Sequence, residues 1–250
     1  MRYVLKVAYD GTDFCGWQVQ NNGRTVQGEL NAAVFRAFGE SATVTASGRT
    51  DSGVHAFAQI CHVDLNAEIA GEKLADALNA RLPDDVSVLS SAQAPQGFDA
   101  NRSAKKKTYE YRMYFAPRRN PLSDRYAVWL RGVPDIVKMR EAAKFFEGEH
   151  DFAAYCASGS QVKTTVRRVY SFEIKEDGGF VTAEVCGNGF LYNMVRTLAG
   201  TALWYSQGKL SAGDIEASLK NGDRNKVGKT MPAKGLTLKS VDYGFNLFNL

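Results

Sequence analysis

The sequence has few cysteines and histidines, and neither kind is arranged to hold a metal ion. The four cysteines stand far apart, at positions 15, 61, 156 and 186, with no C-x-x-C pair among them. The three histidines, at positions 55, 62 and 150, are equally scattered. A structural zinc site needs closely paired ligands, so we expect no bound metal. Cysteines at this spacing favour reduced, buried thiols in a cytoplasmic protein.

Nucleotide-binding loops and membrane-spanning segments are also missing. Neither G-x-x-x-x-G-K-[ST] nor a strand-to-helix G-x-G-x-x-G occurs, which excludes the two best-defined phosphate-binding loops. The most apolar long stretch, 185–208, contains an arginine, several glycines and polar residues, and so predicts a buried helix rather than a membrane span. Residues 1–11 alternate like a strand and carry charges, so we expect no targeting segment.

The overall charge is too small to decide between classes of partner. The chain has 31 Lys and Arg against 27 Asp and Glu, a net charge of +4. Such a charge fits a nucleic-acid-binding protein and an ordinary soluble protein about equally. Apolar residues make up 44% of the 250 residues, which is enough for a normal globular core.

Hydrophobic periodicity divides the chain into two halves of related layout. Strand patterns cover 2–11, 42–47, 54–65, 85–93, 108–116, 166–177, 179–187 and 236–245. Helical patterns cover 25–39, 71–83, 135–148, 190–207 and 211–222. We therefore predict an α+β fold of two similar α/β domains, 1–104 and 105–250, whose largely antiparallel sheets carry helices on one face.

Asp51 lies in a stretch that is almost empty of charge. Between residues 41 and 63 only Arg49 and Asp51 carry a full charge. Glycines at 48 and 53 permit a sharp turn and the close approach of another backbone. A carboxylate in such a turn is most simply a turn-capping Asp. The sparse setting also suits a nucleophile that a substrate has to reach.

Arg196 is the only charged residue between 185 and 208, on a predicted helix that is apolar on nearly every face. A buried arginine needs a carboxylate partner, because an unpaired one would cost several kcal/mol. Asp51 is the candidate with the fewest competing charges nearby. Such a pair would keep Asp51 ionised and fix its direction.

The segment "KKKTYEYRMY" combines positive charge with aromatic rings. Lys105, Lys106 and Lys107 precede a predicted strand whose Tyr109 and Tyr111 share one face. These are the ingredients for stacking an unpaired base while holding phosphates. A half-buried strand with its aromatics in the core explains the same pattern. The basic pair Arg167 and Arg168 would extend this RNA-binding surface, or would simply be exposed to solvent.

Seven motifs in order along the chain give a specific resemblance. They are "AYDGTDFCGWQVQ", "TVQGELNAA", "GRTDSGVHAFAQ", "LNARLPDDV", "FDANRSAKKKTYEYRM", "GEHDFAAYCA" and "GNGFLYNMVRTLAG". Together they resemble the tRNA pseudouridine synthase A (TruA) family. The resemblance implies isomerisation of uridine to pseudouridine at positions 38, 39 and 40 in the anticodon stem-loop of tRNA. It also implies a pseudouridine-synthase fold in which the two sheets join, a homodimer, and neither a metal nor an organic cofactor.

The resemblance also implies roles for four residues. Asp51 would be the catalytic nucleophile, and Arg196 would pair with it. Tyr109 would stack on the target base and help to remove its C5 proton, while Arg49 would extrude the nucleotide or hold its phosphate. Family members often carry arginine where this chain has Lys106 and Lys107, so bidentate phosphate contact is unavailable there.

The chemistry requires that the base leave its stack, because a stacked loop hides the reacting carbons. Attack of the carboxylate at C1′ or at C6, and a glycal path, all remain open. Two other classes of function also remain: a non-catalytic RNA-binding or chaperone module that uses the same basic, aromatic strand, and a structural α/β protein of mild positive charge.

Overall fold

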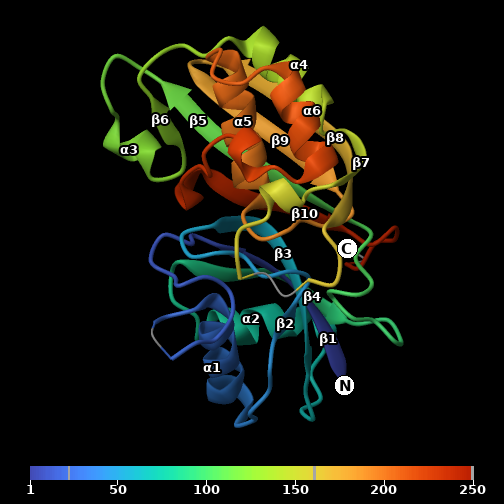
Figure 1. Cartoon of the computed structure of the whole chain (residues 1–250). Helices are drawn as coiled ribbons and strands as arrows, with labels where there is room; N and C mark the ends of the chain where they lie inside the picture. The colour runs from blue at the N-terminus through green and yellow to red at the C-terminus, as the bar shows by residue number, and fades with distance from the viewer. Residues whose placement is uncertain (22, 160–161, 249–250) are drawn as a thin grey trace. The chain divides into compact units, whose positions relative to one another are not determined.

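The structure is a computed structural model that describes residues 1–21, 23–159 and 162–248, and it has an α+β fold (Figure 1). The chain divides into two compact units. Met1–Lys106 and Thr237–Leu250 form the first unit, and Lys107–Leu236 form the second. The predicted domains, 1–104 and 105–250, change at nearly the same place but assign the last strand to the second half.

The first unit contains a mainly antiparallel sheet with two helices. Its strands are β1 (Arg2–Tyr9), β2 (Thr45–Ala46), β3 (His55–Asp64), β4 (Val86–Gln93) and β10 (Leu236–Asp242). β1 pairs antiparallel with β3 and β4, β2 pairs antiparallel with β3, and β10 pairs parallel with β3. The helices are α1 (Val26–Phe38) and α2 (Leu74–Asn79), and the 3-10 turn η1 (Gly71–Lys73) leads into α2.

Helix α1 follows the signals that its sequence carries. The Thr25 side chain accepts a hydrogen bond from the Gly28 N–H, which caps the first turn. Gly39 ends the helix in the left-handed conformation, with φ 69°. Val26, Leu30, Ala33 and Val34 are buried, so the helix covers one side of the core.

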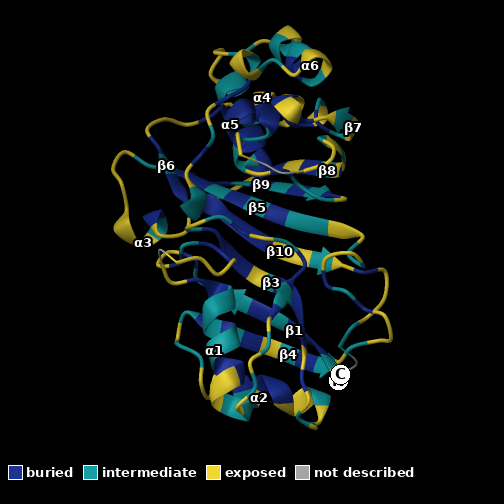
Figure 2. Ribbon diagram, turned by 60° about the horizontal axis from the view of Figure 1, so that its bottom comes forward, coloured by how far each residue is buried: buried dark blue, intermediate teal, exposed yellow. Residues whose placement is uncertain are grey.

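The second unit repeats the mixture of sheet and helices. Its sheet follows the order β5 (Lys106–Phe115), β9 (Phe180–Gly187), β8 (Val166–Asp177) and β7 (Gly148–Asp151), all antiparallel, with β6 (Val128–Leu130) parallel to β5. Its α-helices are α3 (Pro121–Asp124), α4 (Ile136–Lys144), α5 (Met194–Ser206) and α6 (Ala212–Asn221). Short 3-10 turns are η2 (Ala153–Tyr155), η3 (Arg224–Lys226) and η4 (Ala233–Gly235). Within this unit, α4, α5 and α6 lie on the same face of the sheet (Figures 1 and 2).

Helix α5 is the buried helix that the apolar stretch 185–208 predicts. It begins at Met194, and nine of its 13 residues are buried. A Cβ at Gly200 would overlap the carbonyl oxygen of Lys229, so the loop that follows α6 can run directly across the helix backbone. Among the described residues, no helix is long and apolar enough to cross a membrane.

The predicted elements are found, and some of them are shorter than predicted. The strand predicted over 42–47 is only Thr45–Ala46, and the helix predicted over 71–83 ends at Asn79. The pattern missed α3, β6 and β7. These three elements have four residues or fewer, which is too short for periodicity to show.

Candidate active site

Asp51 lies in the turn that connects β2 to β3 in the first unit. The turn is tight, because the Val54 N–H donates to the Asp51 carbonyl at 3.1 Å and Gly53 has φ 78°. Asp51 is partly exposed and Ser52 beside it is exposed, whereas Thr50 is buried. Asp51 is therefore accessible to solvent, while the residue before it in the turn is buried in the core.

The loop that follows β1 holds this turn through backbone hydrogen bonds. The Trp17 N–H donates to the Thr50 carbonyl at 3.0 Å, and the Gly53 N–H donates to the Phe14 carbonyl at 3.3 Å. A Cβ at Gly16 would lie 2.8 Å from the Thr50 carbonyl oxygen. The motifs "AYDGTDFCGWQVQ" and "GRTDSGVHAFAQ", which lie far apart in the sequence, therefore build one structure that fixes the backbone of Asp51.

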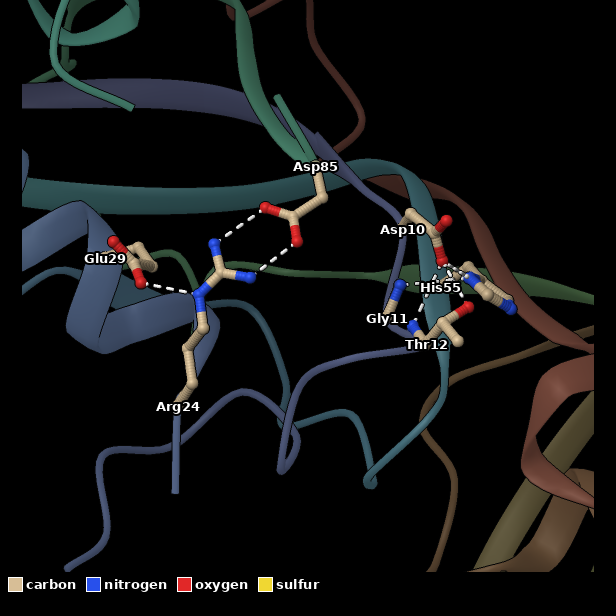
Figure 3. A network of polar contacts seen from close by, with 7 residues as sticks. All are labelled: Asp10, Gly11, Thr12, Arg24, Glu29, His55 and Asp85. Atoms are coloured by element: carbon tan, nitrogen blue, oxygen red, sulfur yellow. Dashed lines mark hydrogen bonds and ion pairs between the residues drawn. The ribbon is translucent and has the colours of Figure 1, made fainter. Parts of the chain in front are cut away.

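A second set of contacts joins the same two motifs through His55 (Figure 3). The Gly11 N–H donates to His55 Nδ1 at 3.0 Å, and Asp10 Oδ1 lies 3.1 Å from the same nitrogen. A Cβ at Gly11 would overlap the Val54 carbonyl oxygen. His55 is only 4% exposed, so we infer that it is part of the structural support of the turn. The sequence offered one signal for this role, the position of His55 inside the "GRTDSGVHA" motif.

Arg24 anchors the far end of the loop (Figure 3). Its guanidinium binds Asp85 with both terminal nitrogens, at 2.6 and 2.8 Å, and binds Glu29 through Nε at 2.7 Å. It also lies over the ring of Phe14, 4.3 Å from the centroid. The hydrogen bond with Asp85 is the largest cause of the raised pKa of Arg24. This fork-shaped contact ties the loop to the start of β4.

Tyr109 lies on β5 in the second unit, next to a cluster of positive charge. Its ring is 8% exposed and packs edge-on against Phe190, with centroids 5.3 Å apart. Burial, with the charge of Arg167, lowers the pKa of Lys107 to about 8. Burial also lowers the pKa of Arg167. The structure thus places Arg167 near Lys107, which lies on the same strand as Tyr109.

The turn 187–190 lies beside Arg167, since a Cβ at Gly189 would be 3.9 Å from Arg167 Nε. The Arg168 N–H donates to Asn188 Oδ1, and the Asn188 N–H donates to the Arg168 carbonyl, both at 3.0 Å. The Arg168 guanidinium is 3.4 Å from Glu149 and is exposed. The backbone of Arg168 therefore holds this turn, while its side chain is exposed.

Arg196 lies in the first turn of α5 and is fixed by two neutral oxygens. Its Nε donates to the Met231 carbonyl and its Nη1 donates to Asn193 Oδ1, both at 2.6 Å. The guanidinium is close enough to Tyr111 to oppose the rise in the pKa of that phenol, which burial causes. Arg196 thus approaches the same strand that carries Tyr109.

The predicted site residues divide between the two units. Asp51 and three exposed cations, Arg49, Lys105 and Lys106, belong to the first unit. The second unit contains Lys107, Tyr109, Arg167, Arg168 and Arg196. The predicted ion pair between Asp51 and Arg196 would join the units, and it stays a prediction. Among the described residues, no group of three His, Cys, Asp or Glu side chains is placed to hold a metal ion.

A comparison with protein families decides the identity. The family described as tRNA pseudouridine synthase matches residues 6–101 and 142–244. The chain belongs to the tRNA pseudouridine synthase family. This synthase is an isomerase that acts on tRNA, so the alternatives of a non-catalytic RNA-binding module and a structural protein are set aside.

Curated relatives agree with this assignment over nearly the whole synthase. "tRNA pseudouridine synthase A" of Ruminiclostridium cellulolyticum is 42% identical over 241 residues, which are 96% of this chain and 98% of the relative. The protein of the same description from Geotalea uraniireducens is 43% identical, over 97% of this chain and 100% of the relative. That from Geobacillus kaustophilus is 42% identical, over 95% and 92%.

A solved structure shows a weaker likeness. The synthase matches a chain of the "Crystal Structure of a Cbf5-Nop10-Gar1 Complex" with a TM-score of 0.42 and 16% identity, over 94% of this chain and 48% of that chain. The assignment to the family does not depend on this match.

Proposed function

We propose that the synthase converts uridine to pseudouridine at positions 38, 39 and 40 of the anticodon stem-loop, with Asp51 as the nucleophile. The observation that carries the proposal is the placement of Asp51. It is a partly exposed carboxylate on a turn whose backbone is bonded to the loop after β1. A nucleophile needs a fixed direction and access for its substrate, and this turn supplies both.

The reaction exchanges one bond between base and sugar for another. The N1–C1′ bond breaks, a C5–C1′ bond forms, the C5 proton is lost and N1 gains a proton. Asp51 attacks the flipped nucleotide, at C1′ or at C6, and leaves again when the new bond has formed. No oxidant or reductant is needed, because the product is an isomer of the substrate.

The second unit supplies contacts for the flipped nucleotide and its phosphates. Flipping costs a few kcal/mol, which stacking on an aromatic ring and phosphate contacts can offset. We assign the stacking to Tyr109, whose hydroxyl also helps to remove the C5 proton. We assign phosphate contact to Arg49, Lys105, Lys106, Lys107, Arg167 and Arg168. Arg196 keeps Asp51 ionised through an ion pair.

The nucleophile is tested by release of tritium from tRNA labelled with 5-³H-uridine. Asp51→Asn removes the negative charge with almost no change in size, and we expect no detectable release. Binding of tRNA should stay within about threefold of the wild type, because phosphate contacts carry the affinity. Asp64→Asn is the matched control, since Asp64 is an exposed aspartate of the same unit that pairs with Arg2. Full activity of Asp51→Asn would refute the assignment.

The modified positions are tested in cells. Pseudouridine mapping of tRNA from cells with and without this chain should show loss at 38, 39 and 40 only in the cells that lack it. Unchanged modification at these positions, together with tritium release by the purified enzyme, would place its target elsewhere in tRNA.

The quaternary state and the compartment complete the proposal. We propose a cytoplasmic homodimer, supported by the resemblance to the TruA family. Sedimentation of the purified protein at micromolar concentration tests the dimer, and a monomer at all concentrations would refute it.

A further inference from the structure

Asn193 has an unusual backbone conformation directly before α5. Its φ is 62° and its ψ is 5°, and it is the single non-glycine residue with positive φ among the residues that the structure describes. Asparagine tolerates this left-handed conformation better than most residues, but glycine adopts it at lower cost. A residue kept in such a conformation needs a reason that lies in its side chain.

Helix capping does not supply that reason. Asn193 occupies the N-cap position of α5, yet its side chain accepts no capping hydrogen bond from the helix backbone. An ordinary N-cap residue has an extended backbone and a side chain that accepts from the N2 or N3 N–H. Asn120, the N-cap of α3, behaves in that way, with φ −106° and a bond from the Leu122 N–H.

The Asn193 side chain binds the Arg196 guanidinium instead. Its Oδ1 accepts from Arg196 Nη1 at 2.6 Å, while the Met231 carbonyl accepts from Nε at 2.6 Å. Two bonds to different nitrogens fix both the position and the plane of a guanidinium. Because both acceptors are neutral, they orient the cation without cancelling its charge.

The location of Arg196 makes such support necessary. It is the third residue of α5, in the first turn, and a cation at this end of a helix is opposed by the helix dipole. The dipole of α5 therefore disfavours a positive charge at the position of the guanidinium. The hydrogen bonds to Asn193 Oδ1 and the Met231 carbonyl oxygen keep the guanidinium there.

We propose that Asn193 is a positioning residue, which holds the Arg196 guanidinium in the orientation that the isomerisation needs. The inference rests on the proposed function, in which Arg196 pairs with the nucleophile. Asn193 acts through Arg196 and touches neither the base nor the sugar. Its loss should therefore lower kcat and leave KM for tRNA nearly unchanged.

The test compares Asn193→Gly with Asn120→Gly. Glycine suits a φ of 62° and keeps the bond from the Thr197 N–H to the carbonyl of residue 193, so Asn193→Gly should melt within a few degrees of the wild type. Its kcat for tritium release should fall about tenfold or more, as expected when a reacting group is misplaced, with KM within about twofold. Asn120→Gly, which removes an ordinary cap, should keep the wild-type kcat. Wild-type kcat in Asn193→Gly would overturn the proposal.

A double variant shows whether the effect passes through Arg196. In single-turnover reactions with enzyme in excess, Arg196→Lys should be slow, and adding Asn193→Gly should slow it by less than about twofold. A full further loss would overturn the proposal, because Asn193 would then act independently. Full activity of Arg196→Lys alone would instead refute the proposed role of Arg196, so the two failures are distinguishable.

A second substitution covers the case in which the glycine variant does not fold. Asn193→Asp keeps the size and the hydrogen bond but adds a negative charge beside the guanidinium. It should be as stable as the wild type and lower kcat about tenfold, because a carboxylate at position 193 competes with Asp51 for the guanidinium and so changes the orientation that Asn193 sets. Wild-type kcat in this variant would overturn the proposal.

Discussion

The charge of Lys107 gives a direct test of how the second unit holds RNA. Burial and the charge of Arg167 lower the pKa of this ammonium to about 8. At that pKa, roughly nine tenths of the side chains are charged at pH 7 and about one tenth at pH 9. If the charged form strengthens binding by roughly tenfold, as one charge-assisted hydrogen bond does, tRNA binding should weaken by about fivefold over this range.

Two substitutions of Lys107 separate its charge from its shape. Lys107→Arg stays charged throughout, so its affinity should not change between pH 7 and pH 9. Lys107→Gln should bind weakly at both pH values, and its salt slope should fall by about 0.7 to 0.9, the value for one phosphate contact. Fluorescence anisotropy with labelled tRNA at constant ionic strength measures all three proteins. Equal pH dependence of the wild type and Lys107→Arg would refute the reasoning.

The contribution of Lys107 to folding stability changes with pH in the opposite direction to its contribution to tRNA binding. The pKa of Lys107 is lowered in the folded protein, from its usual 10.5 to about 8. Between these two values the unfolded chain binds more protons than the folded one. The contribution of Lys107 to stability therefore rises with pH across this window. Weaker tRNA binding at pH 9 would then occur although Lys107 destabilises the folded protein less at pH 9 than at pH 7, and urea unfolding of the wild type and Lys107→Gln at both pH values measures this contribution.

Two further predictions concern the stability of each unit. Gly11→Ala places a Cβ against the Val54 carbonyl oxygen, so it should lower the free energy of unfolding by about 1–3 kcal/mol, as measured by urea unfolding. The control is Gly132→Ala, whose Cβ faces open space and should change this free energy little. Asp124→Asn should destabilise at pH 7. Burial tends to raise the pKa of Asp124, but the hydrogen bond with Lys234 and the charge of Arg119 lower it overall. The loss of unfolding free energy in Asp124→Asn should therefore shrink as the pH falls below about 4. A loss that stays constant down to pH 3 would contradict this prediction.

Regular elements could be predicted from the sequence wherever both of their ends carry a signal. The strand predicted over 166–177 coincides with β8, because alternation ends at two glycines that form the following turn. β7, with the sequence GEHD, has no apolar alternation and was missed. Its place at the edge of the sheet depends on pairing with β8, a contact between strands that a local pattern does not contain.

The candidate site could be predicted only in part, for a related reason. Asp51 and Arg196 could be recognised from the sequence, because Asp51 is one of two charged residues between 41 and 63 and Arg196 is the only one between 185 and 208. His55 and Asn193 were not recognised, because their roles depend on contacts and on backbone angles. His55 meets Gly11 across 44 positions of sequence, and Asn193 has a left-handed backbone that no neighbouring residue signals. Residues that hold a reacting group in place can therefore be recognised only once the folded structure is known.

The hydrogen bonds that directly hold the Asp51 turn and the Arg196 guanidinium come from neutral groups. Backbone amides and carbonyls of the loop after β1 hold the turn of Asp51, and an amide oxygen and a carbonyl oxygen hold Arg196. Neutral dipoles can fix a direction without cancelling a charge, whereas a fixed counter-ion would fix the direction and cancel the charge together. A charged contact with clear fork geometry lies at the far end of the loop, where Arg24 binds Asp85. These neutral groups orient the turn of Asp51 and the guanidinium of Arg196, and the two charges can then act on each other, as the proposed ion pair requires.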